Sequence, residues 1–68
     1  MGNYTITFWF KNGFTITYHA MSYYYQYKDG IKNAMYLENA NESSVMVFFG
    51  EVVAWEIKNN KGGDSLIN

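Results

Sequence analysis

The chain has 68 residues, a formal net charge of −1 and no cysteine. At this length a single core contributes only about 3–5 kcal/mol of net stability, so small domains usually add disulfides, a metal or oligomerisation. The lack of cysteine excludes disulfides and thiolate metal sites, and the single histidine excludes a multi-histidine site. We therefore expect one domain that forms a homo-oligomer, with no metal and no cofactor.

Five basic residues against six acidic residues argue against a nucleic-acid partner, because phosphate contacts require a basic excess. The sequence also contains no apolar run of the roughly 18–20 residues that span a bilayer, and it does not open with a basic region followed by an apolar one. We expect a cytoplasmic protein without a membrane partner.

Residues 4–10 and 14–20 both alternate between apolar and polar side chains, which is typical of half-buried strands. A three-residue loop, Lys11-Asn12-Gly13, keeps the apolar sets of the two strands on one face, whereas a two-residue loop would mix the faces. The predicted cross-strand pairs are Phe10–Phe14, Trp9–Thr15, Phe8–Ile16, Thr7–Thr17, Ile6–Tyr18 and Thr5–His19.

The turn chemistry recurs at Lys28-Asp29-Gly30, between a tyrosine-rich segment and a strand expected from Ile31 to about Glu38. The same loop length predicts the pairs Tyr27–Ile31, Tyr25–Asn33 and Tyr23–Met35. No segment shows a helical period, and at most one helical turn is expected, around residues 20–24.

The polar stretch 39–44 predicts a loop, and the apolar run 45–49 predicts a buried strand. Gly50-Glu51 indicates a tight turn or bend before a last strand over residues 52–58. In that strand the inward side chains are predicted to be Val53, Trp55 and Ile57.

These elements predict an all-β fold: a small antiparallel, strongly bent sheet or barrel of five to six strands built from tight hairpins. We expect residues 1–58 to form the single β domain and residues 59–68 to form a flexible C-terminal tail.

The residue types needed for catalysis are dispersed. Acidic residues lie in predicted turns, loops and solvent-facing positions, and Gly62-Gly63 precedes no predicted helix that could bind phosphate. His19 lies beside threonines on a polar strand face, where it is either a solvent-facing histidine or a ligand contact. We expect no catalytic residues and no enzymatic activity.

Aromatic residues are in excess: seven Tyr, five Phe and two Trp exceed what a core of this size can hide. Three successive tyrosines, Tyr23-Tyr24-Tyr25, must point to both faces of a strand. Tyr23, Tyr25 and Tyr27 are expected to cover the core, while Tyr24, with Trp9 or Tyr36, forms a contact surface. The candidate binding residues are Trp9, His19, Tyr23, Tyr24, Tyr25 and Tyr36.

The hairpin motif Phe8-x-Phe10-Lys11-Asn12-Gly13, followed by the segment 47–55, resembles small β-rich proteins of phages and mobile elements of Gram-positive bacteria. That resemblance implies a phage-encoded protein in the host cytoplasm that blocks a host defence protein by stoichiometric binding. Segment 47–53 also resembles the second motif of Sm-like barrels, but the Arg-Gly pair of that family has no counterpart before Val52.

The leading functional hypothesis is therefore a non-enzymatic binding protein that occludes a host protein. One alternative is a protein that sequesters a small ligand or nucleotide in an aromatic pocket between subunits. The other is a single-stranded nucleic-acid binder that stacks bases on its aromatic side chains.

Overall fold

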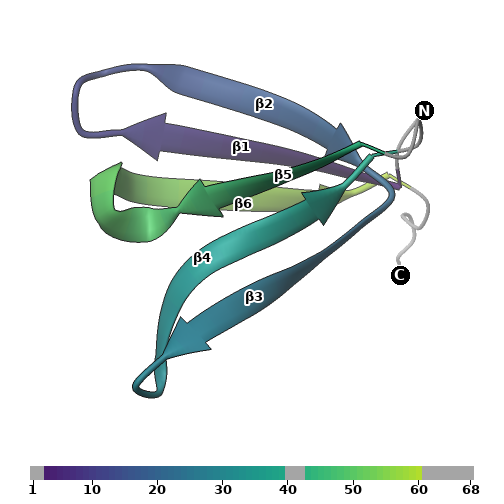
Figure 1. The fold of residues 1–68 in the computed structure, drawn as a ribbon. Helices are drawn as coiled ribbons and strands as arrows, with labels where there is room; N and C mark the ends of the chain where they lie inside the picture. The colour runs from purple at the N-terminus through teal and green to yellow at the C-terminus, as the bar shows by residue number, and fades with distance from the viewer. Residues whose placement is uncertain (1–2, 40–42, 61–68) are drawn as a thin grey trace, which may run out of the picture.

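The computed structural model describes residues 3–39 and 43–60, which form two antiparallel sheets of three strands each (Figure 1). We call the sheet with strand order β2-β1-β6 sheet A and the sheet with order β3-β4-β5 sheet B. The strands are β1 (Tyr4–Phe10), β2 (Thr15–Ala20), β3 (Ser22–Lys28), β4 (Ile31–Glu38), β5 (Ser44–Phe48) and β6 (Val52–Asn59).

This arrangement confirms the predicted all-β class. Met21 alone joins β2 to β3, and the 3-10 turn η1 (Phe49–Glu51) joins β5 to β6, so both connections pass from one sheet to the other. No closed barrel is found among residues 3–39 and 43–60. The two hairpins β1–β2 and β3–β4 diverge from the end where Met21 joins them (Figure 1).

The first hairpin has the predicted register, with Thr7 opposite Thr17 and Phe8 opposite Ile16. The Phe10 N–H donates to the Phe14 carbonyl at 2.9 Å, and the Gly13 N–H donates back to the Phe10 carbonyl at 2.9 Å. Gly13 has φ 92°, a left-handed conformation that glycine adopts without steric cost. Loop length and side-chain alternation therefore specify the same pairing.

The register predicted for the second hairpin is wrong. Asp29 and Gly30 both have positive φ, 54° and 79°, so they form a two-residue turn that places Lys28 opposite Ile31. The register then shifts next to Asn33, and Tyr25 lies opposite Met35. This β-bulge is needed because the turn alone would direct the β4 residues after it to the wrong faces of the sheet.

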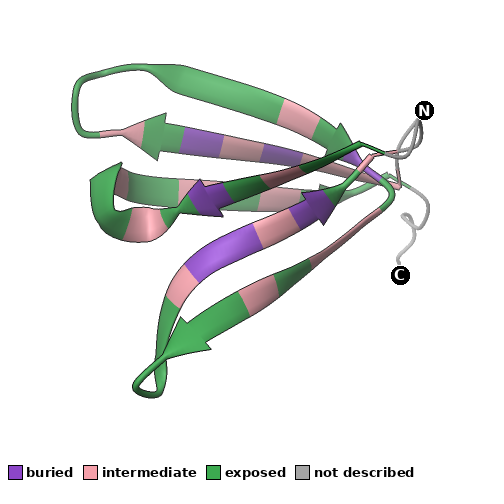
Figure 2. Ribbon diagram, in the orientation of Figure 1, coloured by how far each residue is buried: buried purple, intermediate pink, exposed green. Residues whose placement is uncertain are grey.

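The core lies between the facing sides of the two sheets, and the central strands β1 and β4 supply most of it (Figure 2). Full burial of a large apolar side chain contributes about 1.5–3 kcal/mol. The buried residues that form the cluster are Ile6, Phe8, Ala20, Met35, Leu37 and Val47. Ala20 ends β2 and residues 22–24 belong to β3, so no helical turn forms around residues 20–24; a 3-10 turn occurs instead at η1.

A second bulge corrects the prediction for β6. Phe10 lies opposite Val52 and Trp9 opposite Ala54, so Val53 has no partner in β1 and its side chain is exposed. Val52 takes the half-buried position, while Trp55 and Ile57 pack on the core as predicted.

At the end of the domain and in the loop before β5, the structure agrees in part with the prediction from the sequence. β6 continues to Asn59, and the Asn60 N–H donates to the Asn3 carbonyl at 2.8 Å, so ordered structure extends past the predicted boundary at residue 58. Asn39 and Ser43 are hydrogen-bonded across the predicted loop; residues 40–42 and the tail 61–68 lie outside the described residues. Among the described residues, no helix has the length and apolarity to cross a membrane.

Gly30 and Gly50 offer a matched test of the second turn. A Cβ at either position meets no atom within 4 Å, but only Gly30 of the two has positive φ. Gly30→Ala is expected to lower the free energy of unfolding by about 1–2 kcal/mol, because an L-residue is strained in the left-handed region. Gly50→Ala is expected to cause no loss. Urea unfolding of both variants checks this, and equal effects would contradict the turn conformation.

Candidate functional site

The pleat of β4 divides sheet B into two unlike faces. Met35 and Leu37 point to the core, and the residues between and beside them point away from sheet A. Cross-strand pairing extends this division to β3 and β5. It places Tyr24, Tyr36 and Met46 in one row and Gln26, Ala34 and Phe48 in the next. We call the surface made by these two rows the outer face of sheet B.

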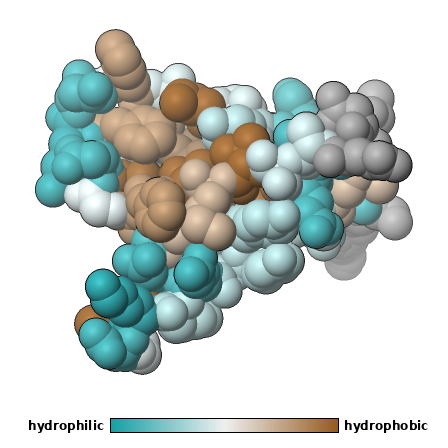
Figure 3. Space-filling model, viewed as in Figure 1, coloured by the Kyte–Doolittle hydropathy of each residue, from teal (hydrophilic) through white to brown (hydrophobic). Residues whose placement is uncertain are grey.

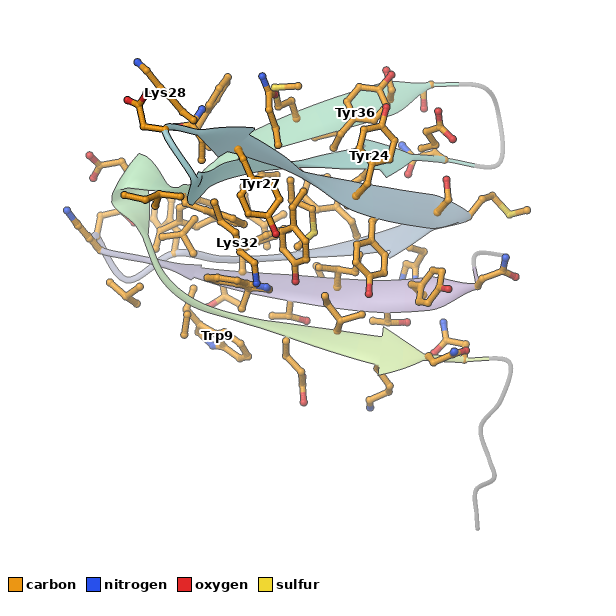
Figure 4. The ribbon with its side chains drawn as sticks, turned by 90° about the horizontal axis from the view of Figure 1, so that it is seen from below. Trp9, Tyr24, Tyr27, Lys28, Lys32 and Tyr36 are labelled. Atoms are coloured by element: carbon orange, nitrogen blue, oxygen red, sulfur yellow. The ribbon has the colours of Figure 1, made fainter. Side chains whose placement is uncertain are left out.

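Large apolar side chains remain uncovered on this face. Tyr24 is 54% exposed and Phe48 is 59% exposed, whereas Ala34 between them is fully buried beneath its neighbours. The Tyr24 and Tyr36 rings lie with centroids 5.0 Å apart and planes tilted by 30°. Figure 4 shows the two rings next to each other on sheet B. Their mutual contact holds both rings in place before any ligand binds.

The middle of the outer face carries no charge. Lys28 lies at one end of β3, and Glu38 lies at the other end of the sheet, where it accepts a hydrogen bond from the Ser22 hydroxyl at 2.8 Å. Apolar surface gathers over β4 and β5, with hydrophilic surface at the β3–β4 turn (Figure 3). An uncharged centre with polar ends is the usual composition of a protein–protein contact.

The pKa of the Tyr24 phenol is raised above its ordinary value of 10.0. Its partial burial is the main cause, and the neighbouring Tyr36 and Glu38 add to it because both disfavour a negative charge on the Tyr24 oxygen. At neutral pH Tyr24 is therefore a hydrogen-bond donor as well as an apolar ring.

Tyr23 and Tyr25 point to the other side of the sheet and are not brought together with Tyr24. Tyr23 packs edge-on against Tyr4 at 5.0 Å. Tyr25 belongs to a cluster in which the Phe49 and Trp55 rings stack at 4.4 Å. Tyr23 and Tyr25 therefore pack on the core, as predicted. Tyr27, which was predicted to cover the core with them, is 57% exposed and does not belong to the core cluster, so that part of the prediction is wrong.

The polar groups of that cluster are engaged within the chain. The Trp55 Nε1–H donates to the Tyr25 hydroxyl at 3.4 Å, and the Lys32 ammonium lies 4.2 Å from the Tyr25 ring centroid. The same ammonium lies 6.0 Å from the Trp55 ring centroid. This cation–π contact occupies the aromatic surface that a planar or cationic ligand would use.

Trp9 and His19 lie on the outer face of sheet A, away from Tyr24 and Tyr36. Trp9 lies opposite Thr15. The His19 ring Nδ1 is 3.3 Å from the Thr5 hydroxyl, so His19 continues a row of hydrogen-bonded polar side chains. No cluster of three metal-ligating side chains occurs in the described part of the chain.

Sequence reasoning missed Met46 and Phe48. The run 45–49 is apolar at every position, which indicated a strand buried on both faces. The structure buries Val47 and leaves Met46 and Phe48 on the outer face of sheet B. The available signal was size: the larger side chains alternate with the smaller valines.

Comparison of the chain with known protein families, curated proteins and solved structures finds no match. No pocket is found in the part of the chain that the structure describes. The candidate site is therefore the outer face of sheet B, as the strand pairing defines it.

The raised pKa of Tyr24 predicts a loss of stability in alkali. The folded chain holds the phenol proton more tightly than the unfolded chain, so this contribution is complete below pH 10.0 and is lost as the pH rises through the folded-state pKa. Tyr23 is shifted in the same direction by burial and by Tyr25 and Tyr4. We expect the free energy of unfolding, measured in urea at a series of pH values, to fall less steeply above pH 10 in Tyr24→Phe than in the unaltered chain. An equal fall in the free energy of unfolding for both chains would contradict a raised pKa of Tyr24.

Proposed function

We propose that this chain is a non-enzymatic binding protein that uses the outer face of sheet B to cover a surface of another protein. The observation that carries the proposal is the exposure of Tyr24 and Phe48 on an ordered, uncharged sheet face. Isolated exposed apolar residues are ordinary, but a contiguous set of this kind is typical of an interaction site.

The energetics suit a protein partner. An aromatic side chain buries about 150–250 Å² when covered, and a standard interface covers about 800 Å² on each partner. Tyr24, Tyr36 and Phe48 would form the desolvated centre of such an interface. Around them Ser22, Gln26, Ser44 and the end charges would form the polar rim that excludes water.

The two alternative ligands have less support. A nucleic-acid site pairs aromatic platforms with a cationic groove, and the lysine beside this face is Lys28, at its end. A nucleotide or other small ligand in an aromatic pocket between subunits would need free ring faces. Those of Tyr25 and Trp55 are approached by Lys32.

We also propose the kind of partner that the chain binds. The resemblance to phage and mobile-element proteins implies a bacterial host protein, blocked by stoichiometric binding in the cytoplasm. Protein contact at an aromatic face agrees with that mode of action, because occlusion needs area and shape rather than catalytic groups.

A photo-crosslinking residue at Tyr24 tests the proposal in living bacteria that make the protein. We expect a discrete covalent product that protease removes and nuclease does not change. The matched control carries the same residue at Thr7, which lies in the centre of sheet A and faces the opposite side of the molecule. That position is expected to give no such product.

Equal crosslinking from both positions, or none from Tyr24, would contradict a contact surface on sheet B. A nuclease-sensitive product would favour the nucleic-acid alternative instead. A second substitution, Phe48→Ser, should remove the Tyr24 product while the chain keeps its circular dichroism spectrum, because Phe48 is exposed and contributes to the interface rather than to the core.

A further inference from the structure

The two sheets of the described residues have four edge strands, which differ in how well they are protected against pairing. Unpaired strand edges bind other strands unless charges, bulges, prolines or short length prevent it. β6 carries a bulge at Val53 and the charges of Glu56 and Lys58. β5 is uncharged and pairs with β4 without a shift, but it has five residues against the six of β2 and ends in η1. β3 lies beside the bulge at Asn33 and ends in Lys28.

The edge strand β2 has none of these features. Its sequence, Thr15–Ala20, contains no formally charged residue and no proline, and its pairing with β1 runs without a shift. Threonine, isoleucine and tyrosine are also residues that favour strands. β2 is therefore the edge best suited to pair with another strand.

The side chains of this edge are left uncovered in the single chain. Phe14 is 67% exposed and Ile16 is 38% exposed, although both lie on the side of sheet A that carries the core. The two hairpins diverge towards their turns (Figure 1). A strand added beside β2 would cover both.

The backbone groups available for pairing follow from the first hairpin. Phe10 and Phe14 form a hydrogen-bonded pair, and such pairs alternate with non-bonded ones along an antiparallel ladder. Ile16 and Tyr18 therefore direct their N–H and C=O groups to β1. Thr15, Thr17 and His19 direct theirs outward.

We propose that two copies of this chain pair through β2, antiparallel about a two-fold axis at Thr17. This register pairs every residue from 14 to 20 and uses all three outward-facing backbone positions. It places Ile16 against Tyr18 of the second copy on the core side, and Thr15 against His19 on the polar side. No two ionised side chains then oppose each other at neutral pH.

The pairing would close at two copies. A two-fold axis at Thr17 uses the β2 edge of both copies, so neither copy presents β2 to a third, and sheet A becomes a six-stranded sheet. The outer face of sheet B stays free in both copies, so the dimer would present two contact surfaces. The inference does not rest on the proposed function, since the two surfaces are separate.

Single cysteines test the register, because the chain has no native cysteine. Thr17→Cys places the two cysteines opposite each other across the axis. Directly paired residues have Cα atoms within the roughly 4.4–6.8 Å separation that a disulfide spans. Thr7→Cys is the matched control. Its hydroxyl is 3.1 Å from that of Thr17, but it lies one strand further from the axis on each side. Mild oxidation is expected to give a covalent dimer with Thr17→Cys and monomer with Thr7→Cys.

Sedimentation of the full chain tests the dimer itself. The unaltered chain is expected to sediment as a dimer. Thr17→Lys, which sets two ammonium groups opposite each other, should raise the dimer dissociation constant by about fivefold or more. Thr7→Lys should leave it unchanged. A chain that stays monomeric at its highest soluble concentration, or Thr17→Cys and Thr7→Cys that crosslink alike, would overturn the proposal. Tyr24 crosslinking reports separately on sheet B.

Discussion

The register between β3 and β4 is the constraint on which both the core and the candidate site depend. The turn at Asp29-Gly30 would direct Met35 and Leu37 away from sheet A, and the bulge at Asn33 turns them inward. The same shift turns Tyr36 outward beside Tyr24. A slip of one residue would exchange the faces, exposing the core and burying the tyrosine hydroxyls. The core and the candidate site therefore both depend on one irregularity in one hairpin.

The small core explains why so much aromatic surface remains for contacts. The cluster between the sheets includes one fully buried aromatic residue, Phe8, and other aromatic residues pack around its edge. Those that point away from sheet A stay exposed, as Tyr24 and Phe48 do. The uncharged β2 edge is a second surface that the single chain leaves uncovered. Partner binding on sheet B and self-association through sheet A would each cover area that a domain of this size cannot bury alone.

The sequence was sufficient for the fold class and for the first hairpin, because alternation and loop length there allow one pairing. It was not sufficient for the second hairpin. A positive φ at Asp29 and a bulge at Asn33 leave no mark on the alternation of side chains. Tyr24 and Tyr36 were predicted as a contact surface and do lie together. Trp9 lies on the other sheet. Phe48 was missed because every residue of the run 45–49 is apolar, so hydrophobicity alone does not tell which of these side chains faces the core once β5 pairs with β4.

Adjacent substitutions in β4 test most directly whether sheet B has one core face and one free face. Leu37→Thr removes a buried side chain and should lower the free energy of unfolding by about 2–5 kcal/mol. Tyr36→Thr removes an outward side chain, keeps a strand-forming residue, and should cost about 1 kcal/mol or less. Urea unfolding of the two variants compares them. A large loss with Leu37→Thr and a small one with Tyr36→Thr is the result the account predicts. Equal losses, or a larger loss with Tyr36→Thr, would contradict it.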